Sequence, residues 1–209
     1  MCNENEGGSV IVVPSSIIPE DEFEGTMLKA VRGDGLAAHH LAYHFGFINH
    51  DYNASLFWDT IGAENGNYPE TQYGLAITLT WPGRDKEDMT RGIFWIYNMV
   101  VVDYRDSVEW LERLGHTLES ARPPGDALFP SLSSLSGSDL TRYREGALQG
   151  SGQAALVLAK YYESIGTDSA EYWYRIGAQN GNKECQRQYG NILLGKEDTL
   201  DQERGKFCC

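Results

Sequence analysis

The sequence predicts an all-α protein, a right-handed α/α solenoid of about five helix pairs preceded by an extended N-terminal arm. Two observations predict this class. The string "IGAENGN" at residues 61–67 returns as "IGAQNGN" at 176–182, with six of seven positions identical, and tryptophans return at a fixed distance before it. A period of about 30 residues with two helices per period is typical of stacked helix pairs, in which each pair covers the apolar face of its neighbour.

Each copy of the repeated string predicts a corner between two helices. Gly66 and Gly181 supply a left-handed residue, which ends a helix at little steric cost. Asn67 and Asn182 follow directly, and asparagine is a favoured helix N-cap. Glu70 stands three residues after Asn67, which is the spacing of a capping box.

The corner recurs twice in a degraded form. "VRGDGLAAHHLAYHF" contains Gly33 and Asp34, and "LQGSGQAALVLAKYY" contains Gly150 and Ser151. The first two corner glycines are 33 residues apart in the sequence and the last two are 31 apart. These spacings give the length of one helix pair.

A column of tryptophans precedes the corners. Trp58 and Trp173 each stand eight residues before a corner glycine, and Trp95 occupies the same kind of segment. Each has a small residue three positions earlier, in turn Ser55, Gly92 and Ala170. Small residues let helices approach closely, and a tryptophan fills the space beside them. The predicted structural core of the repeats is therefore Trp58, Gly66, Trp95, Gly150, Trp173 and Gly181.

The repeated pattern resembles the Sel-one-like repeat, a relative of the tetratricopeptide repeat. "GNKECQRQYG", "SAEYWYRIGAQNGN" and "DYNASLFWDTIGAENGN" carry the resemblance, which covers about residues 28–101 and 140–209. It implies Sel-one-like repeats at 23–101 and 140–209, and a non-enzymatic module that binds proteins.

The remaining residues depart from the pattern. Residues 1–22 contain a β-branched run with two prolines, which favours an extended arm or tether. Residues 102–139 predict a degenerate repeat: one helix over "DSVEWLERLGHTLES", with Val108, Leu111 and Leu118 on one face, then a loop rich in Pro, Gly and Ser. Ser138 is the expected N-cap of the next helix. The loop either carries binding specificity or is a tolerated insertion.

Composition limits the partners and leaves the compartment open. The formal net charge of −13 argues against a nucleic-acid partner and favours a protein partner. A basic protein would complement this charge. No apolar run reaches the roughly 18 residues of a membrane span. Cys2 directly after Met1, followed by a polar stretch, is also the pattern of a lipoprotein whose signal has been removed. The alternatives are therefore a periplasmic protein with a lipid anchor through Cys2, or a cytoplasmic protein.

No catalytic, cofactor or metal site is predicted, and we expect no enzyme. "GDGLAA" and "GSGQAA" fit a dinucleotide-binding pattern, but helices precede both, whereas that pattern requires a strand. His40 and His44 are spaced to share a metal ion, yet no H-E-x-x-H occurs, and surface histidines without metal are the simpler interpretation. No G-x-S-x-G sequence is present.

The first helices of the pairs should form a concave partner-binding face. The repeat register predicts that it contains Leu36, His39, His40, Tyr43, Tyr73, Ile77, Leu156, Lys160, Arg187 and Asn191. The resemblance implies adaptors and scaffolds, and some relatives resemble bacterial immunity proteins that neutralise secreted toxic effectors. Small size, strong acidity and the lack of a predicted active site favour an immunity protein that binds one cognate effector, of the lipase-like kind exported by type VI secretion. The alternative is an adaptor or scaffold in bacterial signalling or envelope assembly.

Overall fold

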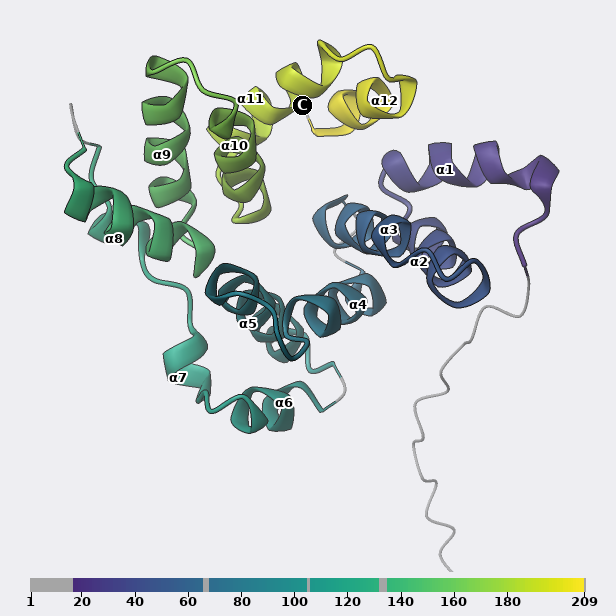
Figure 1. Ribbon diagram of the computed structural model, residues 1–209, viewed down its shortest axis with the longest axis horizontal. Helices are drawn as coiled ribbons and strands as arrows, with labels where there is room; N and C mark the ends of the chain where they lie inside the picture. The colour runs from purple at the N-terminus through teal and green to yellow at the C-terminus, as the bar shows by residue number, and fades with distance from the viewer. Residues whose placement is uncertain (1–16, 66–67, 105, 132–134, 209) are drawn as a thin grey trace, which may run out of the picture.

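The fold was obtained as a computed structural model that describes residues 17–65, 68–104, 106–131 and 135–208, and within these ranges every regular element is helical (Figure 1). The all-α class is therefore confirmed. The elements are η1 (Glu20–Glu22), α1 (Phe23–Val31), α2 (Gly35–Tyr43), η2 (His44–Ile48), α3 (Tyr52–Asn65), α4 (Pro69–Leu79), α5 (Lys86–Val101), α6 (Ser107–Arg113), α7 (Leu118–Ala121), η3 (Asp126–Leu128), α8 (Gly137–Leu148), α9 (Gly152–Ser164), α10 (Ser169–Gln179), α11 (Lys183–Leu194) and α12 (Thr199–Cys208).

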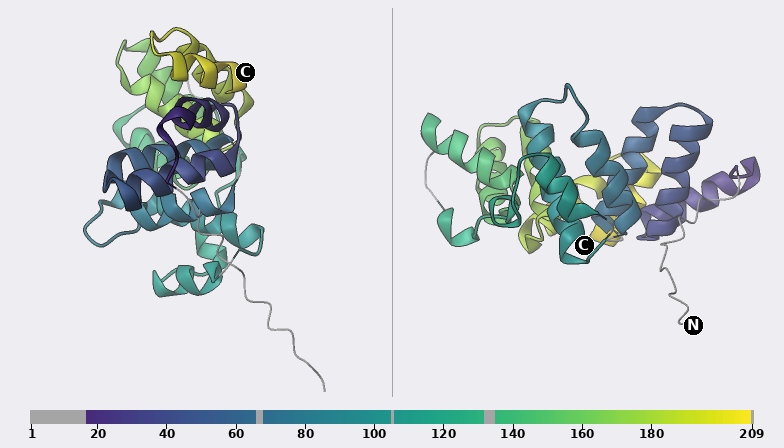
Figure 2. Two further views of the ribbon diagram at one scale, coloured as in Figure 1. Left: turned by 90° about the vertical axis from the view of Figure 1, so that its right-hand side faces the viewer. Right: turned by 90° about the horizontal axis from the view of Figure 1, so that it is seen from below.

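The helices are arranged as a ring. From α1 to α5 and from α8 to α12, each helix packs against the next one in the chain, and α5 contacts α8. The last helix, α12, returns to pack on α1, so the two ends of the array meet (Figures 1 and 2). An exposed ion pair between Arg32 and Glu203, at 2.8 Å, lies at this junction.

The predicted corner is confirmed at three of its four copies. Gly33, Gly150 and Gly181 have φ angles of 97°, 115° and 81°, so each is in the left-handed region that glycine adopts readily. The side chain that follows then caps the next helix, with an oxygen accepting from a backbone N–H three residues on. These caps are Asp34 to Ala37 at 3.0 Å, Ser151 to Ala154 at 3.1 Å and Asn182 to Cys185 at 3.0 Å.

The fourth corner differs from the prediction. Gly66 and Asn67 lie outside the described residues, and the N-cap of α4 is Tyr68, so the prediction that Asn67 caps this helix is wrong. Pro69 explains the shift. Its fixed φ and missing N–H suit the first position of a helix, so α4 begins one residue later than the asparagine pattern indicates.

Three apolar clusters form the core, and each contains one tryptophan of the repeat column. Trp58 lies in the cluster of α1–α3, Trp95 in that of α4–α7, and Trp173 in that of α8–α11. Their side chains are only 4, 3 and 3% exposed.

The glycine of each "IGA" string lies at a close contact between helices. A Cβ atom on Gly177 would be 2.3 Å from Sγ of Cys185, and one on Gly62 would be 2.5 Å from Cγ2 of Thr71. Real Cβ atoms do not approach other atoms so closely. The repeated string thus encodes both a close helix contact and a corner.

Residues 102–139 do not form the single helix predicted for their first part. Gly115, with φ of 80°, separates α6 from α7. Leu111 is buried, whereas Val108 and Leu118 are exposed, so the expectation of one shared apolar face is wrong. The next helix, α8, is capped by Ser136 and not by Ser138.

The N-terminal arm can be followed only from residue 17, and Cys2 lies outside the described residues. Ile18 is buried beside α1 and α2, and its N–H donates to Nδ1 of His44 at 3.4 Å. Glu20–Glu22 form a 3-10 turn, so the end of the predicted extended segment is helical.

Asp59 of α3 is a buried carboxyl group, 7% exposed. Its oxygens lie against Gly74 of α4, where a Cβ atom would be 2.3 Å from Oδ2. Among the described residues, no hydrogen bond or ion pair to this carboxyl group is found. Burial therefore raises the pKa of Asp59 well above its usual range.

Replacing Asp59 by asparagine should stabilise the protein more at pH 7 than at pH 4. The unfolded carboxyl ionises near pH 4, whereas the folded one stays protonated to higher pH. The folded state then binds more protons, so stability falls as the pH rises between the two pKa values. Asparagine does not ionise and avoids this loss. Urea unfolding at both pH values measures the change in stability. An equal change at pH 4 and pH 7 would contradict the prediction. The control is Asp21→Asn, because Asp21 is exposed.

Candidate partner-binding site

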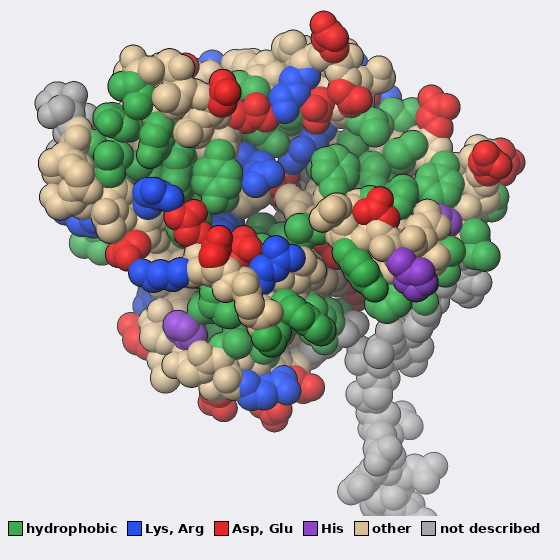
Figure 3. All heavy atoms as spheres, viewed as in Figure 1, with side chains coloured by type: hydrophobic (Ala, Val, Ile, Leu, Met, Phe, Trp, Pro, Cys, Tyr) green, Lys and Arg blue, Asp and Glu red, His purple; other side chains and the backbone are tan. Residues whose placement is uncertain are grey.

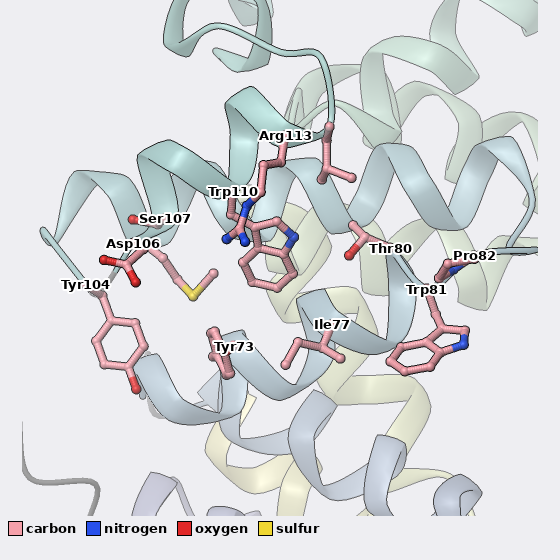
Figure 4. A pocket seen from close by; sticks show the side chains of 12 residues that line it. Tyr73, Ile77, Thr80, Trp81, Pro82, Tyr104, Asp106, Ser107, Trp110 and Arg113 are labelled. Atoms are coloured by element: carbon pink, nitrogen blue, oxygen red, sulfur yellow. The ribbon is translucent and has the colours of Figure 1, made fainter.

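A cleft of about 740 Å³ opens between α4, the end of α5 and α6 (Figure 4). Its walls are mostly apolar and aromatic, with a few polar groups. They are formed by Tyr73, Ile77, Thr80, Trp81, Pro82, Met99, Tyr104, Asp106, Ser107, Trp110, Arg113 and Leu114. We call it the aromatic cleft.

Two helices position the aromatic rings. Tyr73 and Ile77 are four residues apart on α4, which places them on the same side of that helix. Trp110 of α6 faces them across the cleft, and its ring centroid is 5.4 Å from that of Tyr73, edge to face (Figure 4). Tyr104 lies at 6.3 Å from Tyr73 in a similar geometry. These contacts fix the rings before any partner arrives.

Trp81 extends the cleft toward the solvent. It follows α4 in the turn before α5 and is 63% exposed, the least buried tryptophan of the chain. Beside it, the Thr80 hydroxyl donates to the Ala76 carbonyl oxygen at 2.8 Å, so this polar group needs no ligand. Asp106 and Arg113, both exposed, add one negative and one positive side chain to the lining. The cleft can therefore bind apolar groups and orient polar ones.

The ten residues of the predicted partner-binding face lie on α2, α4, α9 and α11, and none is buried. Only Tyr73 and Ile77 line the aromatic cleft. On α2 and α9, which lie on opposite sides of the ring, Leu36 and Lys160 are exposed and the other four, His39, His40, Tyr43 and Leu156, are half-buried (Figure 1). On α11, Asn191 is exposed and Arg187 pairs with Glu184 at 2.8 Å.

Sequence reasoning missed Trp81, Trp110 and Tyr104. A signal for the tryptophans was present. The chain has five tryptophans, of which three belong to the repeat column, and the other two fall outside the repeat register. An aromatic residue that the repeat does not need for its core is a candidate for a binding surface.

The histidines do not form a joint site. His44 is buried, with its ring 4.7 Å from that of Phe23, while His40 is half-buried on α2. Among the described residues, no three His, Cys, Asp or Glu side chains come together in a group that could hold a metal ion. None of the described helices combines the length and apolar character that crossing a bilayer requires.

Comparison with protein-family models, with curated proteins and with solved structures found no match for this chain.

Proposed function

We propose that this chain is a non-enzymatic protein–protein interaction module, a right-handed α/α solenoid of about five Sel-one-like helix pairs that binds its partner at the aromatic cleft. Most specifically, we propose an immunity protein that neutralises one secreted toxic effector, of the lipase-like type VI kind. The observation that carries the proposal of an interaction module is the cleft itself. The immunity role rests on the sequence resemblance and on the acidic charge of the chain.

The exposed aromatic rings of the cleft favour protein binding. Tryptophan and tyrosine dominate the energetics of protein interfaces, because they bury a large area with few rotatable bonds. Trp81 leaves most of its side chain in water, and Trp110 and Tyr73 are only half-buried. A partner that covers the three rings would remove apolar surface from water, worth about 25 cal/mol per Å² buried.

Charge supports a protein partner with basic groups. The chain carries a formal net charge of −13, and such a field attracts a cationic surface and speeds its encounter. The cleft itself contributes apolar contact. The charged surface therefore speeds the encounter with the partner, whereas the cleft supplies most of the affinity. Binding should therefore begin faster at low salt while its residence time depends on the cleft.

The proposal predicts that Trp81→Ala weakens partner binding by about 30-fold or more, the effect of an interface hot spot of 2 kcal/mol. The melting temperature should change little, since the side chain is already exposed. Tyr73→Ala should also weaken binding with only a small loss of stability. Calorimetric titration with the purified partner gives the affinities.

Tyr52 provides a matched control, because it is 71% exposed on α3 and does not line the cleft. Tyr52→Ala should bind the partner as the unchanged protein does. Equal affinities for Trp81→Ala and Tyr52→Ala would contradict the proposed site. One partner bound at nanomolar strength or better supports the immunity role, whereas several weak partners support the adaptor alternative.

A further inference from the structure

Polar side chains from opposite parts of the ring meet near its centre. Arg91 comes from α5, Arg175 from α10, Arg204 from α12 and Glu64 from α3. On the face of the molecule that Figure 3 shows, Lys and Arg side chains gather around the hollow at the middle. We call these four residues the central hub, which is rich in positive charge although the chain as a whole is acidic.

Arg91 is buried, 5% exposed, and all its hydrogen bonds go to neutral groups. Its guanidinium donates to the Leu148 carbonyl oxygen at 3.2 Å, to Oδ1 of Asn180 at 2.9 Å and to Oε1 of Gln179 at 2.7 Å. Burial is the main cause that lowers the pKa of Arg91 to about 9; the nearby charge of Arg175 contributes to this shift, and Tyr172 and Glu64 oppose it. No carboxylate pairs with Arg91 among the described residues.

Arg175 is half-buried and has no hydrogen bond or ion pair among the described residues. Its Nε atom is shielded from solvent and unpartnered. The guanidinium carbon lies 5.7 Å from the ring centroid of Tyr172. Glu171, one turn earlier on α10, is paired with Nζ of Lys196 at 2.7 Å.

Among the described residues, Glu64 is the carboxylate that the hub contains. Glu64 is buried and pairs with Arg204, and it also accepts from Nε2 of Gln179 at 2.5 Å. In the part of the chain that the structure describes, no carboxylate pairs with Arg91 or with Arg175. The acids at the start of α5 do not supply a counter-charge, because Glu87 pairs with Arg144 and Asp88 with Arg84.

Positive groups removed from water without a counter-charge are costly, and an anion bound between them removes that cost. We propose that Arg91 and Arg175 form an oxyanion-binding site, which a carboxylate or a phosphate group fills. Guanidinium suits both ligands, since its planar N–H groups bind two oxygens at once. The anion comes either from an acidic side chain of a bound protein or from a small inorganic ion. This site is distinct from the aromatic cleft, so each can be tested without the other.

Thermal unfolding with added inorganic phosphate, or with a tetraglutamate peptide, tests the site against sodium chloride at equal ionic strength. We expect a saturable rise in melting temperature with at least one of the two probes. In Arg175→Gln the rise should vanish, with affinity by calorimetry falling about tenfold or more, as for the loss of a charged hydrogen bond. In chloride alone this variant should be at least as stable as the unchanged protein, because it loses a positive charge that has no counter-charge.

The control is Arg187→Gln, an exposed arginine already paired with Glu184, which should keep the full response. A response to phosphate alone assigns the site to a small anion. A response to the peptide, with or without phosphate, assigns it to acidic side chains. No response to either probe, or an equal response in Arg175→Gln, would overturn the proposal.

Discussion

Replacing Trp173 by alanine should lower the free energy of unfolding by about 3–5 kcal/mol, the range for a large buried aromatic side chain. Trp173 is 3% exposed and belongs to the cluster of α8–α11, where its ring meets that of Tyr172 at 4.9 Å. Truncation would leave a cavity that the neighbouring helices can close only in part. Denaturant unfolding followed by circular dichroism measures the loss.

Trp81→Ala is the matched control, because the same truncation at an exposed tryptophan should cost far less. A loss below about 1 kcal/mol at Trp173 would mean that the tryptophan column does not hold the helix pairs together. The repeat register predicted from the sequence would then be wrong.

Replacing Glu64 by glutamine should lower the free energy of unfolding by about 3–5 kcal/mol as well, for a different reason. Glu64 and Arg204 form a buried ion pair that joins α3 to α12, although they are 140 residues apart in the sequence. The glutamine variant removes the carboxylate charge that pairs with the buried Arg204 guanidinium. Urea unfolding measures the effect, and the double variant Glu64→Gln/Arg204→Met should recover part of it.

The exposed pair between Lys86 and Glu145 provides the control for the buried one. Glu145→Gln should cost less than about 1 kcal/mol, since water screens an exposed pair. An equally small cost for Glu64→Gln would show that the ring does not depend on this contact between α3 and α12.

The sequence predicts local features of this fold well, because they depend on neighbouring residues. The corner at Gly181 and Asn182 needs only a left-handed glycine and a capping side chain, both of which are visible in the string. The wrong prediction that Asn67 caps α4 also has a local cause. Pro69 competes as a helix-starting residue, and its effect on the first position decides where α4 begins.

Features that depend on distant residues could not be predicted. The return of α12 to α1 and the meeting of Arg91, Arg175 and Arg204 depend on contacts between helices that are far apart in the sequence. The aromatic cleft depends on the packing of α6 opposite α4, which places Trp110 against Tyr73. Of the residues that line the cleft, the repeat register predicted Tyr73 and Ile77, and it did not predict the residues on the opposite wall.

Affinity capture with the unchanged protein and with Trp81→Ala, from the lysate and secreted fraction of the producing cell, tests the central claim most directly. The proteins that survive a high-salt wash are identified by mass spectrometry. We expect one stoichiometric protein on the unchanged chain, with a basic surface, and its loss from the Trp81→Ala chain. No retained protein, or a partner held equally by both chains, would contradict the account of the aromatic cleft as the partner-binding site.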